Sequence, residues 1–276
     1  FGLKHIVFTW ENIPYENKFK GLNLLFKKMI IRLNILLSDG IICGNRKAES
    51  IFKQLTNKPL AVIPLSGVDN DFFHKVNVDN FLEIHNLKDN LIFSFAGAIG
   101  YRKGIHNIIH AFKKVISALP NAHLIIAGIG EYEEEISELV TKLNLENNVT
   151  RIPWLSSIGL RELLSASHIF LYPSISYEGW EEQFGYSMAE ASLMELPVIS
   201  TLSGSIGDVV VSGETGILIK PNDEVSLGKA MIRLGSDKEL RIKMGQAGRE
   251  HIIKNFTYQI IAEKFYEFFK KINIHS

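Results

Sequence analysis

The sequence predicts an α/β protein with two parallel sheets, of which only the second is complete. Apolar runs of strand length alternate with longer amphipathic stretches along the whole chain. This alternation is typical of parallel strands joined by covering helices. The chain has 276 residues, of which 46 % are hydrophobic, and can bury a sizeable core. One large domain or two modest ones are therefore expected.

The first part of the chain predicts a small sheet. Strands are expected at 5–9, 40–43 and 60–63, with helices at 18–36 and 46–55. A doubly wound domain usually has about six strands, so we expect further strands upstream and interpret the chain as the C-terminal portion of a two-domain protein. The polar stretch 64–90 predicts the connection to the second part.

The second part predicts a complete doubly wound sheet. Strands are expected at 91–97, 122–128, 148–152, 168–172, 197–201 and 215–219, and helices at 104–118, 131–143, 158–166, 184–195 and 206–211. About six parallel strands are enough for a full domain of this class. Residues after about 223 predict helices alone, ending with one near 258–271. The expected divisions are 1–66, 67–255 and a C-terminal segment 256–276.

Composition excludes several classes of protein. Lysine plus arginine equals aspartate plus glutamate, 30 against 30, so no global field attracts nucleic acid. Cys43 is the single cysteine, which excludes an internal disulfide and a cysteine metal cluster and favours a reducing, cytoplasmic setting. The nine histidines show no metal-ligand spacing, so no metal is expected.

The helix expected at 18–36 has two interpretations. It carries basic residues, Lys18, Lys20, Lys27, Lys28 and Arg32, among apolar ones. A basic amphipathic helix can lie on an anionic membrane surface, which would place the protein at the inner face of the membrane. The favoured interpretation is a helix that covers a sheet, because all such helices are amphipathic.

The segment 173–201 carries the clearest chemical pattern. It leaves a strand, crosses an acidic loop that contains Glu182, and enters a helix near Gly185. Ligands of open α/β sheets bind at the carboxyl ends of the strands, where this loop lies. The free N–H groups at the start of the helix suit a diphosphate. Glu182 and Glu190 are acceptors suited to the hydroxyls of a hexose and a ribose.

These residues also resemble a known family. Glu182-Gln-Phe-Gly-Tyr-Ser-Met-Ala-Glu190 matches the E-x7-E motif of retaining glycosyltransferases of the GT-B fold, family 4 type, and 190–200 resembles the family's EAMAxGxPVIxS. Further similar segments are 62–69 (VIPNGVD), 95–104 (GRLxxxKG), 122–130 (LxIxGxG) and 201–216 (TxxGGxxExVxxGxTG). The resemblance covers about residues 60–270.

The resemblance implies a function. It predicts transfer of a hexose from a UDP-, GDP- or ADP-linked sugar to an unidentified acceptor, with retention of configuration and without a cofactor. The implied catalytic residues are Glu182, which holds the hexose, and Lys103, which neutralises the diphosphate. The other implied substrate-binding residues are Gly97, Arg102, Ile152, Phe184, Gly185, Tyr186, Glu190 and Gly204. The last helix is expected to cross back to the first domain.

Some positions depart from the family pattern, and two alternatives stay open. Ala98 stands where the family usually has arginine, which leaves Lys103 and Arg102 for the diphosphate, and Asp208 replaces a glutamate. Glu11 falls where many members carry a histidine that faces the acceptor. The chain is alternatively a binding module without turnover, or another nucleotide-sugar enzyme of this fold, such as a phosphorylase or a 2-epimerase.

Overall fold

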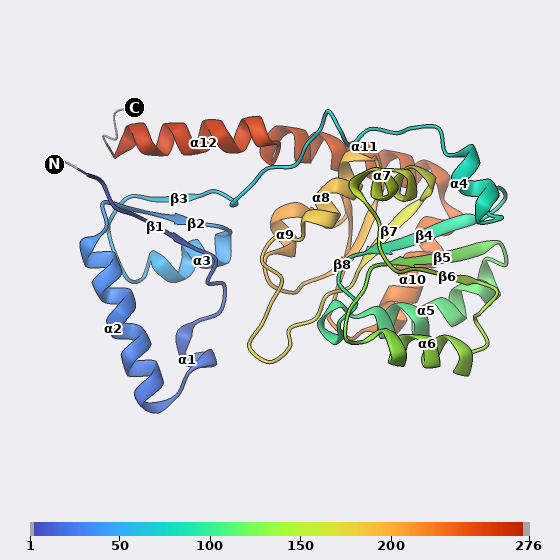
Figure 1. The fold of residues 1–276 in the computed structure, drawn as a ribbon, viewed down its shortest axis with the longest axis horizontal. Coiled ribbons are helices and arrows are strands. Elements are labelled where there is room, and N and C mark those ends of the chain that lie inside the picture. The colour runs from blue at the N-terminus through green and yellow to red at the C-terminus, as the bar shows by residue number, and fades with distance from the viewer. Residues whose placement is uncertain (1–2, 273–276) are drawn as a thin grey trace.

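The computed structural model describes residues 3–272 and consists of two parallel α/β units (Figure 1). The smaller unit has three strands in the order β1-β2-β3, all parallel. Its elements are β1 (Ile6–Thr9), α1 (Tyr15–Lys18), α2 (Gly21–Leu37), β2 (Gly40–Cys43), α3 (Arg46–Phe52) and β3 (Leu60–Val62). The prediction of a small first sheet is confirmed.

The larger unit is the predicted doubly wound sheet. Its strands are β4 (Leu91–Ala96), β5 (Ala122–Ala127), β6 (Val149–Ile152), β7 (Ile169–Tyr172), β8 (Val198–Thr201) and β9 (Gly216–Ile219). All six are parallel, in the order β6-β5-β4-β7-β8-β9. The direction of winding reverses between β4 and β7, and such a switch point is where sheets of this class bind ligands.

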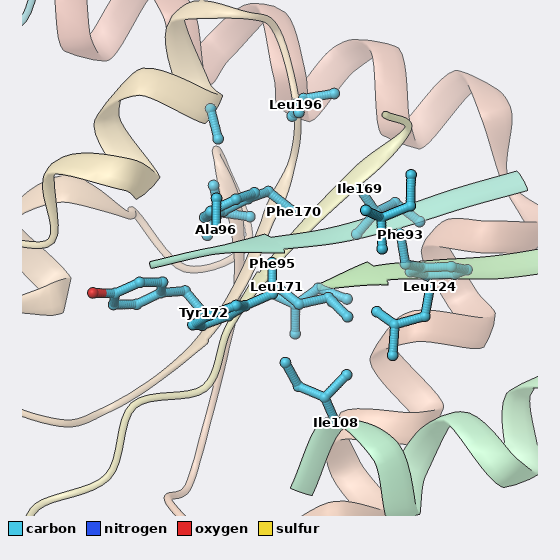
Figure 2. Packing of buried hydrophobic residues seen from close by; sticks show 14 of the residues in the cluster. Phe93, Phe95, Ala96, Ile108, Leu124, Ile169, Phe170, Leu171, Tyr172 and Leu196 are labelled. Carbon is cyan, nitrogen blue, oxygen red and sulfur yellow. The ribbon is translucent and has the colours of Figure 1, made fainter. Parts of the chain in front are cut away.

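Helices connect the strands and cover both faces of the sheet (Figure 1). They are a 3-10 turn η1 (Tyr101–Lys103), α5 (Ile105–Ala118), α6 (Glu133–Lys142), α7 (Ser157–Ala166), α8 (Tyr186–Leu193), α9 (Ile206–Val209), α10 (Glu224–Ser236) and α11 (Lys238–Asn255). The strands read as near-continuous apolar runs because helices on both faces bury both sets of side chains. Figure 2 shows Phe93, Phe95 and Phe170 packed in this core, with the Tyr172 hydroxyl pointing out of the apolar cluster.

Two segments differ from the prediction. The helix expected at 18–36 is divided into α1 and α2, because Gly21 has a φ of 57°, outside the helical range. The connection 64–90 contains a short helix, α4 (Asp79–Ile84), because Phe81 turns into the core of the larger unit. Helical pattern over so few residues is too weak to predict.

The last helix, α12 (Tyr258–Lys271), lies against the smaller sheet. Its residues Ile261 and Phe268 pack with Ile42 of β2 and with Ile63 in one apolar cluster. Backbone hydrogen bonds pair its start with the connection, from Val68 N–H to the Phe256 carbonyl and from Tyr258 N–H to the Val68 carbonyl. Figure 1 shows α12 running from α11 across to the smaller unit. The domain limits at 66 and 255 stay a prediction.

Helix α2 covers the smaller sheet with only one of its faces. Ile35 is buried against that sheet. A second apolar face is exposed and consists of Leu22, Phe26, Met29, Leu33 and Leu36. Along residues 3–272, no helix is both long and apolar enough to cross a bilayer.

Candidate functional site

Two adjoining cavities open at the carboxyl ends of the strands of the larger sheet. The polar cavity, about 460 Å³, is lined by Arg102, Lys103, Tyr172, Glu182 and Gly185, and by Trp10 and Leu65 from outside the larger unit. The apolar cavity, about 310 Å³, is lined by Ala127, Ile129, Trp154, Leu155 and Leu160. Gly97, Ala98 and Ser187 line both cavities. A ligand with an apolar end and a polar end can therefore extend from one into the other.

Lys103 and Glu182 form a buried ion pair in the polar cavity. Lys103 ends the turn η1 after β4, and Glu182 lies in the loop before α8. Their Nζ and Oε2 atoms are 2.7 Å apart, and each residue is only 7 % exposed. The Lys103 ammonium also donates to the Tyr172 hydroxyl at 2.6 Å, and the Ser174 hydroxyl donates to Glu182 Oε2 at 3.2 Å. The two residues predicted as catalytic are thus direct partners.

The electrostatics of this pair follow from burial. Removal of water lowers the pKa of Lys103, and the neighbouring Glu182 carboxylate opposes that shift. Burial, followed by the same carboxylate, raises the pKa of Tyr172 well above its ordinary value, so its hydroxyl stays protonated. The cavity therefore presents a cation and a carboxylate, each held at low water access, where charge interactions are strong.

Arg102 is held by a small hairpin. Tyr177 and Trp180 exchange two backbone hydrogen bonds around a two-residue turn, in which Glu178 has a φ of 47° and Gly179 a φ of 73°. The turn presents the Trp180 ring to the Arg102 guanidinium, whose central carbon lies 4.0 Å from the ring centroid. This stacking keeps a second cation at the wall of the polar cavity.

The helix α8 begins at the polar cavity. Gly185 precedes it with a φ of 82°, which only glycine adopts without strain, and no side chain caps this end in the described part of the chain. Uncapped N–H groups and the positive end of the helix dipole favour an anion. Glu190 lies three residues beyond Ser187, which lines both cavities, but Glu190 itself is not among the residues that line either one. Burial raises the pKa of Glu190 to about 7.

Some of the other predicted residues line the polar cavity, and some do not. Phe184 and Tyr186 line the polar cavity, and the Tyr186 hydroxyl contacts the backbone of Ser66. Ile152 ends β6, where its carbonyl accepts from the Gly128 N–H, and it is not among the residues that line either cavity. Glu11 pairs with Lys18 in the smaller unit.

Gly204 packs directly against the backbone of Glu182. Its φ is 58°, and a Cβ at this position would come within 2.0 Å of the Glu182 carbonyl oxygen. The same carbonyl accepts from the Ser205 N–H at 2.8 Å. Gly204 therefore acts on the loop that carries Glu182, and it does not line either cavity.

Gly204→Ala is expected to lower the free energy of unfolding by at least about 1–2 kcal/mol. The new alanine would have to adopt a left-handed backbone conformation, and its Cβ would also clash with the backbone of Glu182. Gly207→Ala is the matched control, since a Cβ there meets nothing within 4 Å. Urea unfolding of both variants measures the difference. Equal stability of the two would contradict the close approach of Gly204 to Glu182.

Several residues of the site were not predicted from the sequence. Tyr172, Ser174 and Trp180 contact the predicted catalytic residues, and Ser187 lines both cavities. A usable signal existed for Ser187 alone, since it stands between the two glutamates of the motif. Within residues 3–272, no group of three or more His, Cys, Asp or Glu side chains is arranged to hold a metal ion.

Comparison with known proteins identifies the family. The model of the family "Glycosyl transferases group 1" matches residues 77–251. The chain therefore belongs to this family. Its two parallel sheets correspond to the GT-B fold.

Individual proteins to which the chain is similar are also glycosyltransferases. The capsular polysaccharide biosynthesis glycosyltransferase CapM of Staphylococcus aureus is 32 % identical over 85 % of this chain and 59 % of its own length. A GDP-mannose-dependent mannosyltransferase of Corynebacterium glutamicum, which acts on a phosphatidylinositol mannoside, is 32 % identical over 59 % of this chain and 42 % of its own length. The chain thus spans about two fifths to three fifths of these relatives.

The same fold occurs in a solved nucleotide complex. Anabaena HepE in complex with UDP superposes with a TM-score of 0.85 at 18 % identity, covering 97 % of this chain and 72 % of HepE. At this identity the likeness establishes the two-sheet architecture and leaves the ligand of this chain to further argument.

Proposed function

We propose that the chain binds a nucleoside-diphosphate hexose and, as part of a glycosyltransferase, transfers the hexose to an acceptor with retention of configuration. The observation that carries the proposal is the meeting of three features in one cavity: the uncapped start of α8, the Lys103–Glu182 pair and the stacked Arg102. The start of α8 and the cations Lys103 and Arg102 suit a diphosphate, and the Glu182 carboxylate suits the hydroxyls of a sugar.

The adjoining cavities support an orientation for the donor. The base lies in the apolar cavity, near Trp154 and Ile129, and the diphosphate and hexose lie in the polar cavity. Glu190, in α8 three residues beyond Ser187, accepts hydrogen bonds from the ribose. The named activities of relatives support such a donor, since one is GDP-mannose-dependent and HepE was solved with UDP.

In this orientation the residues act mainly by electrostatics. As the bond to the hexose breaks, negative charge develops on the diphosphate, and Lys103 and the α8 N–H groups stabilise it. These donors are already in place, so little reorganisation accompanies the reaction. Glu182 fixes the hexose in the reactive geometry. Side-chain cations and the helix dipole thereby take the role that a metal ion has in other transferases.

A thermal-stability screen with UDP, GDP, ADP and their hexose conjugates tests the donor class. A ligand at 100 times its Kd adds about 2.7 kcal/mol to the stability of the folded state, so one base should raise the melting temperature clearly. Lys103→Ala should remove most of the effect. No shift with any nucleotide, or the same shift in Lys103→Ala, would contradict the proposal.

A binding module without turnover is the second candidate. The observation that favours it is the wall of the polar cavity, to which, within residues 3–272, the part outside the larger unit contributes Trp10 and Leu65 alone. The chain also spans only 59 % of the length of CapM. Turnover of radiolabelled donor with and without candidate acceptors separates the two functions.

Nucleotide binding should strengthen between pH 6 and pH 8. Because burial holds the pKa of Glu190 near 7, its carboxyl is protonated below that pH and accepts hydrogen bonds poorly. One pH unit below the pKa only about a tenth of the group is ionised, so the affinity at pH 6 should be about tenfold weaker than the plateau. Calorimetric titration with the nucleoside diphosphate measures the slope. Glu190→Gln should flatten it, and an equally steep slope in that variant would assign the titration to another group.

A further inference from the structure

The loop that carries Glu182 is held by the smaller unit as well as by its own. Its three consecutive residues Glu181, Glu182 and Gln183 stand immediately before the segment that opens α8. Within the larger unit, Ser205 N–H binds the Glu182 carbonyl and the Ser174 hydroxyl binds its carboxylate. In the described part of the chain, the other hydrogen bonds to the carbonyls of residues 181–183 come from across the interface between the two units.

Two buried asparagines of the smaller unit make those contacts. The Asn12 side-chain amide donates to the Glu182 carbonyl at 3.1 Å, and the Asn45 amide donates to the Gln183 carbonyl at 3.2 Å. Asn12 is 4 % exposed and Asn45 is 1 % exposed. Buried amides of this kind are costly to leave unpaired, so they fix the carbonyls that they bind.

Asn45 is attached to a rigid element. Its side-chain oxygen accepts from the Ala48 N–H at 2.8 Å and caps α3, while its nitrogen reaches across to the loop. The two residues that follow it also contact the larger unit, since Arg46 N–H binds Asp208 Oδ2 at 3.0 Å and the Lys47 ammonium lies 2.7 Å from Glu181 Oε2. The first turn of α3 is therefore docked on the larger unit by three successive residues.

We propose that Asn12 and Asn45 are positioning residues that hold Glu182 at the hexose end of the donor site, so that this end is complete only when the two units are docked. The inference rests on the proposed function, since it assigns Glu182 to the hexose. It predicts that contact between the units governs the hexose-binding end of the site and leaves binding of the nucleotide unaffected, because the apolar cavity proposed for the base is lined by residues 96–187 of the larger unit. Asp substitutions test it, because they keep the shape and the α3 cap while replacing each donor by an oxygen that faces a carbonyl.

The experiment compares Asn12→Asp, Asn45→Asp and the double variant with Asn90→Asp as the control. Asn90 also donates its amide to a backbone carbonyl, that of Asn121 at 3.1 Å, at the opposite end of β4. The probes are UDP with UDP-glucose, GDP with GDP-mannose, and ADP with ADP-glucose, titrated by calorimetry into the 276-residue chain. Amide hydrogen exchange over residues 174–187 is measured on the same samples without ligand.

For the pair of ligands that binds, Asn12→Asp, Asn45→Asp and the double variant should each bind the sugar conjugate at least about fivefold more weakly than the parent. Their affinity for the nucleoside diphosphate should stay within about twofold of the parent. Exchange over 174–187 should become faster, and the control should match the parent in both measurements. Equal loss of both ligands, or faster exchange with an unchanged affinity for the conjugate, would overturn the positioning role. If the parent binds none of the six ligands, the donor-binding function fails, and unchanged exchange in the variants would separately refute the positioning role of the two asparagines.

Discussion

Glu182→Ala is expected to lower the free energy of unfolding by about 3–5 kcal/mol, because it leaves the Lys103 ammonium buried without its counter-ion. The pair is 2.7 Å apart and both residues are 7 % exposed, so removal of the carboxylate takes away the charged partner of a poorly hydrated ammonium. The Tyr172 hydroxyl would remain as a neutral partner for the ammonium. Urea unfolding of the parent and the variant at pH 7 measures the change.

The pH dependence of that loss has a definite sign. Burial already lowers the pKa of Lys103, and loss of Glu182 removes the charge that opposes this shift. Between the lowered pKa of Lys103 in the folded variant and the ordinary pKa of lysine, the folded variant binds fewer protons than the unfolded chain, so its stability rises with pH in that window. The deficit relative to the parent should therefore shrink as the pH is raised towards 10, near the ordinary pKa of lysine.

A double variant separates stability from function. Replacing a buried ion pair by apolar residues of similar volume is often neutral or stabilising. Lys103→Met combined with Glu182→Leu should therefore recover most of the lost stability and bind no donor. If Glu182→Ala costs less than about 1 kcal/mol, the pair is worth no more than an exposed ion pair. If the double variant stays as unstable as the single one, the loss arises from the Tyr172 and Ser174 hydroxyls.

The strand pattern made the strands of the larger sheet predictable, whereas their pairing order comes from the structure. Alternation of apolar runs and amphipathic stretches located all six strands of this sheet to within a residue or two. The break before Gly21 was missed because a single glycine inside a helical pattern does not by itself end a helix, and α4 was missed because it depends on the packing of Phe81 in the core of the larger unit. Local pattern carries no information about such tertiary contacts.

The candidate site shows the same limit. Glu182 and Gly185 were found because they lie close together in sequence, next to a strand end and a helix start. The contact between Lys103 and Glu182 joins residues 79 positions apart, and the contact between Asn12 and the Glu182 carbonyl joins residues 170 apart. Both depend on how the strands order and how the two units dock. The roles of the site residues in donor binding stay predictions.

The two glutamates of the motif should separate by ligand. Glu190→Ala is expected to weaken binding of the nucleoside diphosphate by roughly ten- to a hundredfold, because the ribose loses a charged hydrogen-bond acceptor worth about 1.5–3 kcal/mol. Glu182→Ala should leave that affinity unchanged or increase it, since the ligand has no hexose and Lys103 is released from its ion pair. Lys103→Ala should weaken binding of both the nucleoside diphosphate and the intact donor, because the diphosphate is common to them.

The intact donor then reveals the role of Glu182. Calorimetric titrations with the nucleoside diphosphate and with its hexose conjugate should show a selective loss for the conjugate in Glu182→Ala, and donor turnover should fall because the hexose is no longer fixed in the reactive geometry. Glu182→Gln is the control for folding, since its amide oxygen can still accept from Lys103. If Glu182→Ala reduced affinity for the nucleoside diphosphate as severely as Glu190→Ala, one carboxylate could not be assigned to the hexose and the other to the ribose. The buried pair of Glu182 with Lys103 would then be part of the diphosphate site itself.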